Sequence, residues 1–571
     1  MRGALPRVLC ALLLASGATA AGARAASSPP GSAPGAASGA ATASGSASGS
    51  GSAASRAAAA EVDARVIPVP AAVQAGGGAF RITSGTRIEV DGGADAPDAG
   101  SPEAHAVADY AAALLRPATG YPLPVEQSRT ADGEGGRDAD PAGIVLALDS
   151  ADPGLGDEGY RLRTTAQAVT VTARTPAGLF HGVQTLRQLL PAAVESHDAV
   201  SGVAWTVPDA DIRDVPRYAY RGAMLDSARH FLTVAQVERA IDQYALYKIN
   251  TLHLHLTDDQ GWRIAIDSWP RLASYGGSTQ VGGGSGGYYT QADYREIVRY
   301  AASRFLTVVP EIDGPGHSNA ALASYAELNC DGKAPALYTG TAVGFSSFCA
   351  PKEVTYTFLD DVVREIAALT PGPYVHIGGD EAQSTSAADY ATYTDRAQQI
   401  VAAHGKTAVG WHQIDSAHPA PGALAQYWGT AGNEADVAKA AQAGTGLIMS
   451  PANRSYLDMQ YDASTPVGKH WAGYVDVRTS YDWDPATFVQ GVPAGAVRGV
   501  EAALWTETLQ ANKDMDYMTF PRLPGIAEIG WSPQATHDWD AYRVRLAAQG
   551  PRWAAMGIDY YRSPQVDWPA S

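Results

Sequence analysis

The stretch RGAMLDSARHFLTVAQVERAIDQYALYKINTLHLHL, residues 221–256, contains a strand, a helix and a second strand. Apolar runs at residues 221–225 and 251–256 mark the two strands, and polar residues follow the first run. Between them, Thr233 and Gln236 have the spacing of a capping box, after which apolar side chains recur every three or four residues. A strand, a crossover helix and a second strand in this order are typical of a parallel sheet.

The same alternation of apolar strand, polar loop and amphipathic helix repeats through the rest of the chain. The expected strands are residues 221–225, 251–256, 307–312, 374–377, 408–411, 425–428, 447–449 and 500–504. Eight strands within about 290 residues, mostly separated by helical patterns, predict an α/β fold, a closed (β/α)8 TIM barrel, over residues 218–571. An open doubly wound sheet is the main alternative.

Residues 62–210 show a different pattern of short strands and two helices. Strands are expected at residues 80–90, 144–148 and 168–172, and helices at residues 105–115 and 176–190. This pattern predicts a small α+β domain before the barrel. The alternating charges of residues 209–217 mark the expected boundary between the two domains.

The N-terminus has the pattern of an export signal. Arg2 and Arg7 precede an apolar run at residues 8–15, and small residues with two Ala-x-Ala cleavage patterns follow, so residues 1–25 are the expected signal peptide. The run is too short for a membrane anchor. Residues 26–60, rich in Ala, Ser and Gly, are an expected flexible linker. We therefore expect a secreted protein that does not associate with membranes after signal cleavage.

The composition is that of a globular protein, with 46% apolar and 18% charged residues and a formal net charge of -18. This acidic balance argues against nucleic-acid binding, which needs a basic face. Cys10 lies in the expected signal peptide, which leaves Cys330 and Cys349. In an exported chain these two cysteines are expected to form a disulfide, because their spacing is too long for a zinc-binding C-x-x-C pair.

Polar and aromatic residues are concentrated directly after the expected barrel strands, where this fold places its active sites. They include Asp226, Arg229, His253, His255, Asp258, Asp259, Glu311, Asp313, His317, Asp380, Glu381, Trp411, Trp428, Tyr456, Asp458, Trp505 and Glu507. Carboxylates and arginine suit sugar hydroxyls, and indole rings suit the apolar faces of sugar rings. The set predicts a sugar-binding site.

Two alternatives stay open from the residues alone. His253 and His255 alternate with leucines and could bind a metal together with Asp258 and His317, as in a metal-dependent barrel hydrolase. Such histidines are more often hydrogen-bonded core residues, so neither a metal nor another cofactor is expected. The second alternative is a non-catalytic sugar-binding protein, in which the adjacent carboxyls after residue 379 would have no purpose.

Four motifs occur together in the barrel: Arg229-His230-Phe231, residues 253–262, residues 311–317 and residues 376–381, the last reading HIGGDE. With these motifs, in this order, the chain after the linker resembles glycoside hydrolase family 20, the β-N-acetylhexosaminidases. The resemblance implies exo-hydrolysis of terminal β-linked N-acetylhexosamine, GlcNAc and also GalNAc, from glycans or chitooligosaccharides. It implies an oligosaccharide partner, and we expect a monomer.

The resemblance also implies roles for single residues. Glu381 would be the general acid/base, and Asp380 would orient the 2-acetamido group of the substrate. The remaining roles are Tyr456 for the acetamido oxygen, Trp411, Trp428, Trp471 and Trp505 for the pocket walls, Arg229, Asp458 and Glu507 for ring hydroxyls, and Asp258 and His317 for tuning Glu381.

The adjacency of the two carboxyls favours a substrate-assisted reaction. Ordinary retaining glycosidases place two carboxyls about 5–5.5 Å apart across the sugar, whereas neighbours leaving one strand are expected to diverge. In the substrate-assisted reaction the acetamido oxygen attacks C1. Asp380 stabilises the charge on the amide nitrogen, and Glu381 begins as the acid. The product would keep the β configuration.

Overall fold

The structure is a computed structural model that describes residues 64–91, 102–127 and 143–570. The expected signal peptide and linker, residues 1–60, lie outside the described residues. Among the helices of the described part, none is both long and apolar enough to cross a membrane.

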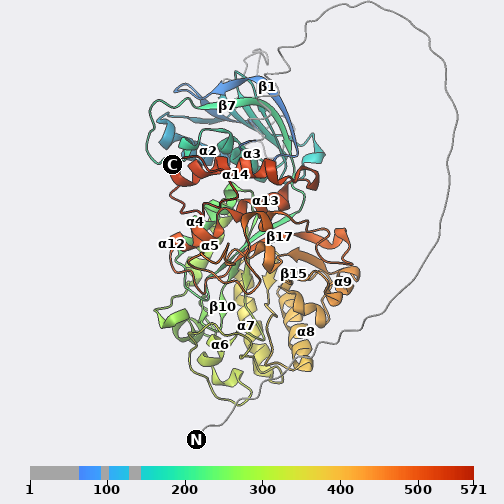
Figure 1. The fold of residues 1–571 in the computed structure, drawn as a ribbon. Coiled ribbons are helices and arrows are strands. Elements are labelled where there is room, and N and C mark those ends of the chain that lie inside the picture. The colour runs from blue at the N-terminus through green and yellow to red at the C-terminus, as the bar shows by residue number, and fades with distance from the viewer. Residues whose placement is uncertain (1–63, 92–101, 128–142, 571) are drawn as a thin grey trace, which may run out of the picture. The chain divides into compact units, whose positions relative to one another are not determined.

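Seven strands of the described residues form one mixed sheet in the N-terminal domain (Figure 1). They are β1 (Ala72–Arg81), β2 (Arg87–Asp91), β3 (Val125–Gln127), β4 (Gly143–Leu148), β5 (Tyr160–Thr164), β6 (Val169–Ala173) and β7 (Thr206–Asp214). Their order across the sheet is β1-β7-β5-β6-β4-β2-β3. β2, β3, β4 and β6 run parallel, whereas β7 pairs antiparallel with β1 and β5.

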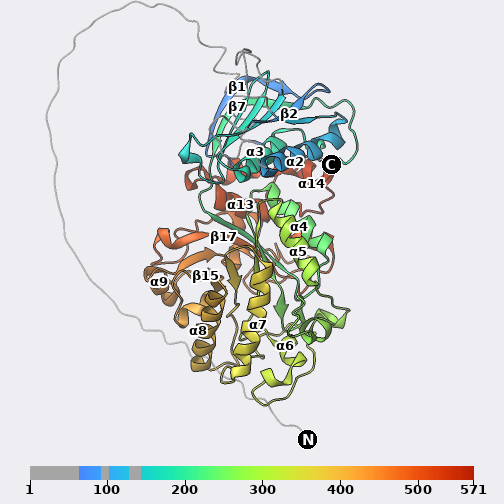
Figure 2. The same cartoon turned by 180° about the vertical axis from the view of Figure 1, so that it is seen from behind.

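Helices α2 (Pro102–Thr119) and α3 (Pro176–Leu189) pack together against this sheet (Figure 2). Thr175 caps α3 by accepting a hydrogen bond from the Gly178 N–H, and Pro176 occupies the first turn. Leu179 and Val183 of α3 are completely or almost completely buried. The small domain expected before the barrel is therefore present.

One strand expected in this domain was wrong in detail. The strand expected at residues 80–90 is two strands, β1 and β2, separated by a turn in which the Thr83 N–H donates to Thr86 Oγ1. The expected boundary at residues 209–217 overlaps β7, which continues to Asp214. The alternating charges there are one half-buried face of a strand whose other face is in the core.

Eight parallel strands close the barrel in the order β8-β9-β12-β13-β14-β15-β16-β17, with β17 pairing with β8. Their bounds are β8 (Tyr220–Asp226), β9 (Thr251–His255), β12 (Thr307–Glu311), β13 (Tyr374–His376), β14 (Thr407–Trp411), β15 (Leu424–Tyr427), β16 (Gly446–Met449) and β17 (Val497–Leu504). Each overlaps an expected strand, so the closed barrel is confirmed and the open sheet is excluded. A short ribbon, β10 (Thr257–Asp258) and β11 (Gly261–Trp262), follows β9.

Helices lie on the outside of the barrel, and α7 and α8 run alongside each other there (Figures 1 and 2). In chain order they are α4 (Val234–Leu246), α5 (Gln291–Ala302), α6 (Asn319–Ser324), α7 (Glu353–Leu369), α8 (Ala387–Ala403), α9 (Ala435–Gln442), α10 (Ala452–Ser455), α11 (Val477–Tyr481), α12 (Asn512–Thr519), α13 (Arg522–Trp531) and α14 (Trp539–Ala555). The predicted capping box of Thr233 and Gln236 begins α4.

Candidate active site

A turn with left-handed backbone follows β13 and carries the two adjacent carboxyls. Gly378 and Gly379 have φ of 68° and 104°, and Glu381 has φ of 46°. A side chain at Gly378 would be blocked, because an added Cβ would lie 1.6 Å from Asp313 Oδ1. Glycine is therefore required at this position both for conformation and for space. The strained φ of Glu381 is of the kind found at functional sites.

Both carboxyls of this turn approach the same imidazole. His317 Nε2 lies 3.4 Å from Asp380 Oδ2 and 3.3 Å from Glu381 Oε2. The expectation that the two side chains diverge was wrong, because they leave a tight turn and not a continuing strand. The side chain of Glu381 is 30% exposed and that of Asp380 is 12% exposed. Glu381 is thus the more accessible of the two to solvent and ligand.

A buried carboxylate lies behind His317. Asp258 accepts a hydrogen bond from His317 Nδ1 at 3.2 Å, and its other oxygen lies 2.6 Å from Arg229. Burial raises the pKa of Asp258, but Arg229 and His317 outweigh this and hold it far below its usual value. Burial lowers the pKa of His317, but Asp258 and Asp380 outweigh it and raise this pKa well above its usual value. The structure thus aligns Asp258, His317 and Glu381 in a row of contacts.

Asp226, the last residue of β8, fixes the loop that carries Arg229. Its Oδ1 accepts the N–H groups of Ala228 and Arg229 at 2.8 and 3.1 Å, and its Oδ2 accepts the Thr506 N–H at 3.0 Å. Because Thr506 follows β17, this single carboxylate joins the ends of the first and last barrel strands.

Four aromatic side chains form what we call the indole cluster: Trp411, Trp428, Tyr456 and Trp505. Ring centroids are 5.7 Å apart for Trp411 and Trp505 and 6.0 Å apart for Tyr456 and Trp505. Trp471 stands at the outer edge of the cluster, 54% exposed and edge-on to Trp428 and Tyr456. The four tryptophans expected to line a sugar pocket are therefore brought together with Tyr456.

Two further carboxyls, Asp458 and Glu507, each lie two residues after a member of this cluster, Tyr456 and Trp505. Asp458 Oδ1, Glu507 Oε2 and Trp505 Nε1 are buried and have no hydrogen-bond partner within the described residues. Burial, followed by the charge of Glu507, raises the pKa of Asp458 well above its usual value. Buried polar atoms without partners are rare in folded proteins, so a polar ligand is expected to satisfy them.

Two carboxylates inside the barrel, Glu311 and Glu501, were not assigned roles from sequence. His253 contacts Glu501 Oε1 through Nδ1 at 2.7 Å and Glu311 Oε2 through Nε2 at 3.0 Å. His255 likewise contacts Glu311 through Nδ1 and Asp258 through Nε2, the latter at 3.0 Å. We call this row, from Glu501 to Asp258, the axial ladder. The sequence signal that could have identified Glu501 is a carboxylate within an apolar strand, Val500-Glu501-Ala502.

The axial ladder disfavours a metal site at these histidines. Both ring nitrogens of His253 and of His255 contact carboxylates, so a metal ion bound by either histidine would have to replace one of these contacts. Burial lowers the pKa of His253, but Glu501 and Glu311 outweigh it and raise this pKa to about 9. Ion-paired imidazolium groups are therefore favoured over metal ligands.

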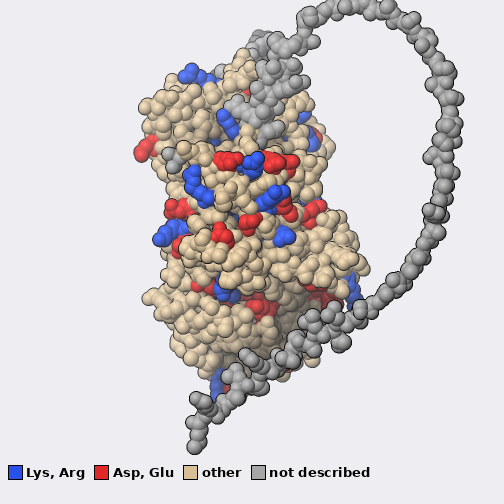
Figure 3. Space-filling model, in the orientation of Figure 1, with Lys and Arg blue, Asp and Glu red and all other residues tan. Residues whose placement is uncertain are grey.

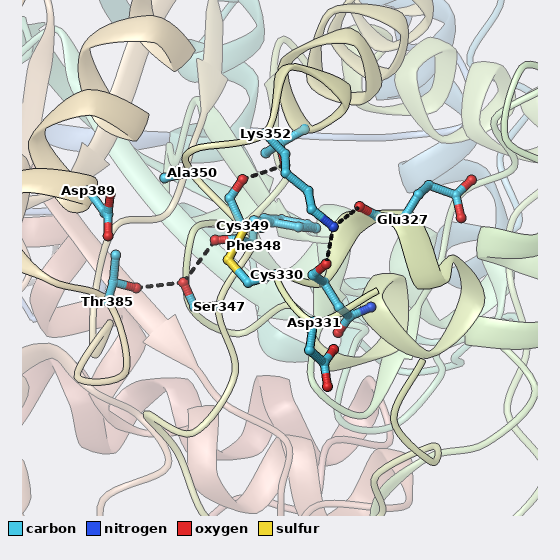
Figure 4. The surroundings of a disulfide bond; sticks show 12 residues. Glu327, Cys330, Asp331, Ser347, Phe348, Cys349, Ala350, Lys352, Thr385 and Asp389 are labelled. Atoms are coloured by element: carbon cyan, nitrogen blue, oxygen red, sulfur yellow. Dashed lines mark hydrogen bonds between the residues drawn. A yellow bond between two sulfur atoms is a disulfide. The ribbon is translucent and has the colours of Figure 1, made fainter. Parts of the chain in front are cut away.

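The structure joins Cys330 and Cys349 in a disulfide, and Figure 4 shows its surroundings. An added Cβ at Gly344 would lie 3.3 Å from the Glu381 carbonyl oxygen. Nearby, Ser347 Oγ shares a 2.6 Å hydrogen bond with Thr385. The disulfide thus closes a loop that borders Glu381.

Comparison with known families finds two matches along the chain. The profile for "Glycosyl hydrolase family 20, catalytic domain" matches residues 218–534. The profile for "Glycosyl hydrolase family 20, domain 2" matches residues 63–215. The two matches therefore cover the barrel and the domain before it.

Individual proteins are similar over almost the whole described chain. A β-N-acetylhexosaminidase of Cellulomonas fimi is 43% identical over 508 residues, which cover 89% of this chain and 98% of that protein. A solved family 20 β-N-acetylhexosaminidase of Streptomyces coelicolor A3(2) is 63% identical, with a TM-score of 0.83, covering 89% of this chain and 99% of the other. A mutant Streptomyces plicatus β-hexosaminidase, solved with the product GlcNAc, is also 63% identical, with a TM-score of 0.83 and coverages of 89% and 98%.

Proposed function

The chain belongs to glycosyl hydrolase family 20, and we propose that it acts as a β-N-acetylhexosaminidase that removes terminal, non-reducing β-linked N-acetylhexosamine. Its substrates are glycans or chitooligosaccharides ending in GlcNAc, and also GalNAc. The GlcNAc product bound to the Streptomyces plicatus relative supports this substrate class. The export pattern of residues 1–25 supports a secreted enzyme.

The observation that carries the proposal is the convergence of Asp380 and Glu381 on His317 beside the indole cluster. Glu381, the more exposed carboxyl, protonates the leaving oxygen and later takes a proton from the attacking water. Asp380 holds the acetamido N–H and stabilises the positive charge that develops when the acetamido oxygen attacks C1. Because two inversions occur at C1, the product keeps the β configuration.

The other side chains bind and enclose the sugar in this proposal. Tyr456 donates to the acetamido oxygen, and the indoles shield the acetamido group from water, which strengthens the electrostatic contacts. Arg229, Asp458 and Glu507 bind the ring hydroxyls, consistent with the unpartnered oxygens of the two carboxyls. Trp471 offers an exposed ring face at the edge of the site. No metal or cofactor takes part.

The decisive experiment compares a chromogenic N-acetyl-β-glucosaminide with the matching β-glucoside. The glucoside lacks the nucleophile, so we expect a negligible rate on it although it keeps the ring hydroxyls. Asp380→Asn should lower the rate on the N-acetylglucosaminide by about 10²–10³-fold. A glycosyl ester trapped on a protein carboxylate would contradict the substrate-assisted route.

Two controls address the alternative functions. Loss of activity after dialysis against a chelator would favour a metal-dependent hydrolase. Binding of N-acetylglucosamine without turnover of any N-acetylhexosaminide would favour a sugar-binding protein.

A further inference from the structure

One lysine, Lys469, forms an ion pair with Glu507, one of the two carboxyls proposed to bind sugar hydroxyls. Its Nζ lies 3.2 Å from Glu507 Oε1. Its backbone is held on both sides, because the Lys469 N–H donates to the Asp458 carbonyl at 2.8 Å and the Lys469 carbonyl accepts from the Gln460 N–H at 2.6 Å. The ammonium group therefore reaches Glu507 from a fixed backbone position.

The ion pair is partly shielded from water. The side chain of Glu507 is 14% exposed and that of Lys469 is 28% exposed, so screening by solvent is weaker than for a surface pair. One Glu507 oxygen is held by the ammonium, whereas Oε2 is buried and has no hydrogen-bond partner among the described residues. The pair thus leaves one defined oxygen available to a ligand.

Other charged groups near Glu507 do not replace this ammonium. Arg229 lies close enough to interact with Glu507 electrostatically, but its guanidinium forms a 2.6 Å ion pair with Asp258. Arg522, near Asp458, donates its hydrogen bonds to four backbone carbonyls. Within the described residues, Lys469 is the cation that forms an ion pair with Glu507, at 3.2 Å.

We propose that Lys469 is a positioning residue, which holds one oxygen of Glu507 so that Oε2 is turned to accept a hydroxyl of the bound sugar. This inference rests on the proposed function. Burial, followed by the charge of Glu507, raises the pKa of the neighbouring Asp458, so Asp458 keeps its proton and can donate to a sugar oxygen. The two carboxyls would act as a fixed acceptor and donor pair.

This arrangement bears on the choice between substrates. GlcNAc and GalNAc differ only in the direction of the hydroxyl at C4, so an acceptor with a fixed direction distinguishes them better than a mobile one. Loss of Lys469 should therefore weaken binding of both sugars and reduce the preference between them. Binding would be weakened equally in the ground state and the transition state, so KM should change and kcat should not.

The test uses Lys469→Met and Lys469→Gln in the full-length enzyme, with Lys469→Arg as the conservative variant. For the first two we expect KM for aryl N-acetylglucosaminide to rise about tenfold with kcat within about twofold, because a hydrogen bond to a charged group is weakened. Lys469→Arg should restore most of the affinity. Lys439→Met, on the exposed face of α9, is the matched control and should behave as wild type.

The pH profile separates a charge effect from a packing effect. The groups facing the Glu507 carboxyl are Lys469, Asp458 and Arg229. Burial and Glu507 raise the pKa of Asp458, whereas Lys469 lowers it. Without the ammonium, the acidic limb of kcat/KM should therefore move to higher pH in Lys469→Met and not in Lys469→Arg. A packing defect would lower affinity equally at every pH.

Unchanged KM in both neutral variants, or an arginine variant as weak as the methionine variant, would overturn the inference while wild-type turnover still supports the proposed function. No turnover by the wild-type enzyme would overturn the proposed function itself, and this inference with it.

Discussion

At Glu381 the carboxyl is accessible to solvent and has a buried imidazole 3.3 Å away. Replacing Glu381 by Gln keeps the shape of the side chain but removes the proposed proton donor. We expect Glu381→Gln to lower kcat by about 10²–10⁴-fold on a substrate with a poor leaving group, and by much less on one whose leaving group needs no proton. Rates on a series of aryl glycosides measure this. An equal loss for every leaving group would contradict the acid role.

A companion variant is His317→Gln, which leaves Glu381 in place but removes the imidazole between Asp258 and Glu381. His317→Gln should change the pH profile of kcat as well as the value of kcat at its optimum. Residue-scale geometry of this kind was only partly predictable. The motif residues were identified from sequence, but their convergence on one nitrogen depends on the left-handed turn at Gly378, Gly379 and Glu381, which sequence periodicity does not reveal.

Among the elements, strands β9, β10, β12 and β17 carry the axial ladder. The pKa of His253 is raised from 6.5 to about 9 in the folded protein. A raised pKa contributes stability that is complete below about pH 6.5 and is lost as pH rises through 9. We expect Glu501→Gln to lower the free energy of unfolding by about 1–3 kcal/mol at pH 6, and the difference from wild type to vanish above pH 9.

Denaturant unfolding at several pH values measures this difference. Tyr220→Phe is the control, because the Tyr220 hydroxyl donates to the same carboxylate at 2.6 Å and carries no charge at these pH values. Tyr220→Phe should lower the free energy of unfolding by a similar amount at every pH. A Glu501→Gln defect that does not depend on pH would contradict the ionised state of the ladder.

The elements themselves differed in how well sequence predicted them. All eight barrel strands were predicted, because each is a short apolar run followed by polar residues at the end where the loop begins. β7 was missed because its charged residues form one face of a strand, and charge alone does not distinguish such a face from a loop. The ladder was missed because it joins residues far apart in sequence, such as His253 and Glu501.

In the whole molecule, buried ion pairs connect the N-terminal domain to the barrel. Glu158 pairs with Arg221 of β8 through two hydrogen bonds of 2.6 and 3.1 Å, and the Arg221 side chain is fully buried. Burial raises the pKa of Glu158, but Arg221 outweighs this and holds it far below its usual value. Elsewhere on the surface, acidic and basic side chains are interspersed, as the face in Figure 3 shows.

We expect Glu158→Gln to destabilise the protein by about 3 kcal/mol near neutral pH, because it leaves a buried guanidinium without its anion. A depressed carboxyl pKa contributes stability above its unfolded value, so the difference from wild type should shrink as pH falls below about 4.5. Calorimetry measures this. Glu126→Gln, which breaks the exposed pair with Arg87, is the control and should change stability by less than about 1 kcal/mol.

The carboxylate of Asp226 has a kinetic consequence. It joins β8 to the segment after β17, and its contact with Thr506 spans 280 residues of sequence. Bringing such distant segments together is an entropically costly, slow event in folding. Arg229 and Glu507 lie on either side of this contact, so the hydroxyl binding that we propose for them requires a closed barrel. During refolding, catalytic turnover should therefore return only when the barrel closes, later than helical content. Turnover of substrate during refolding then measures the rate of barrel closure.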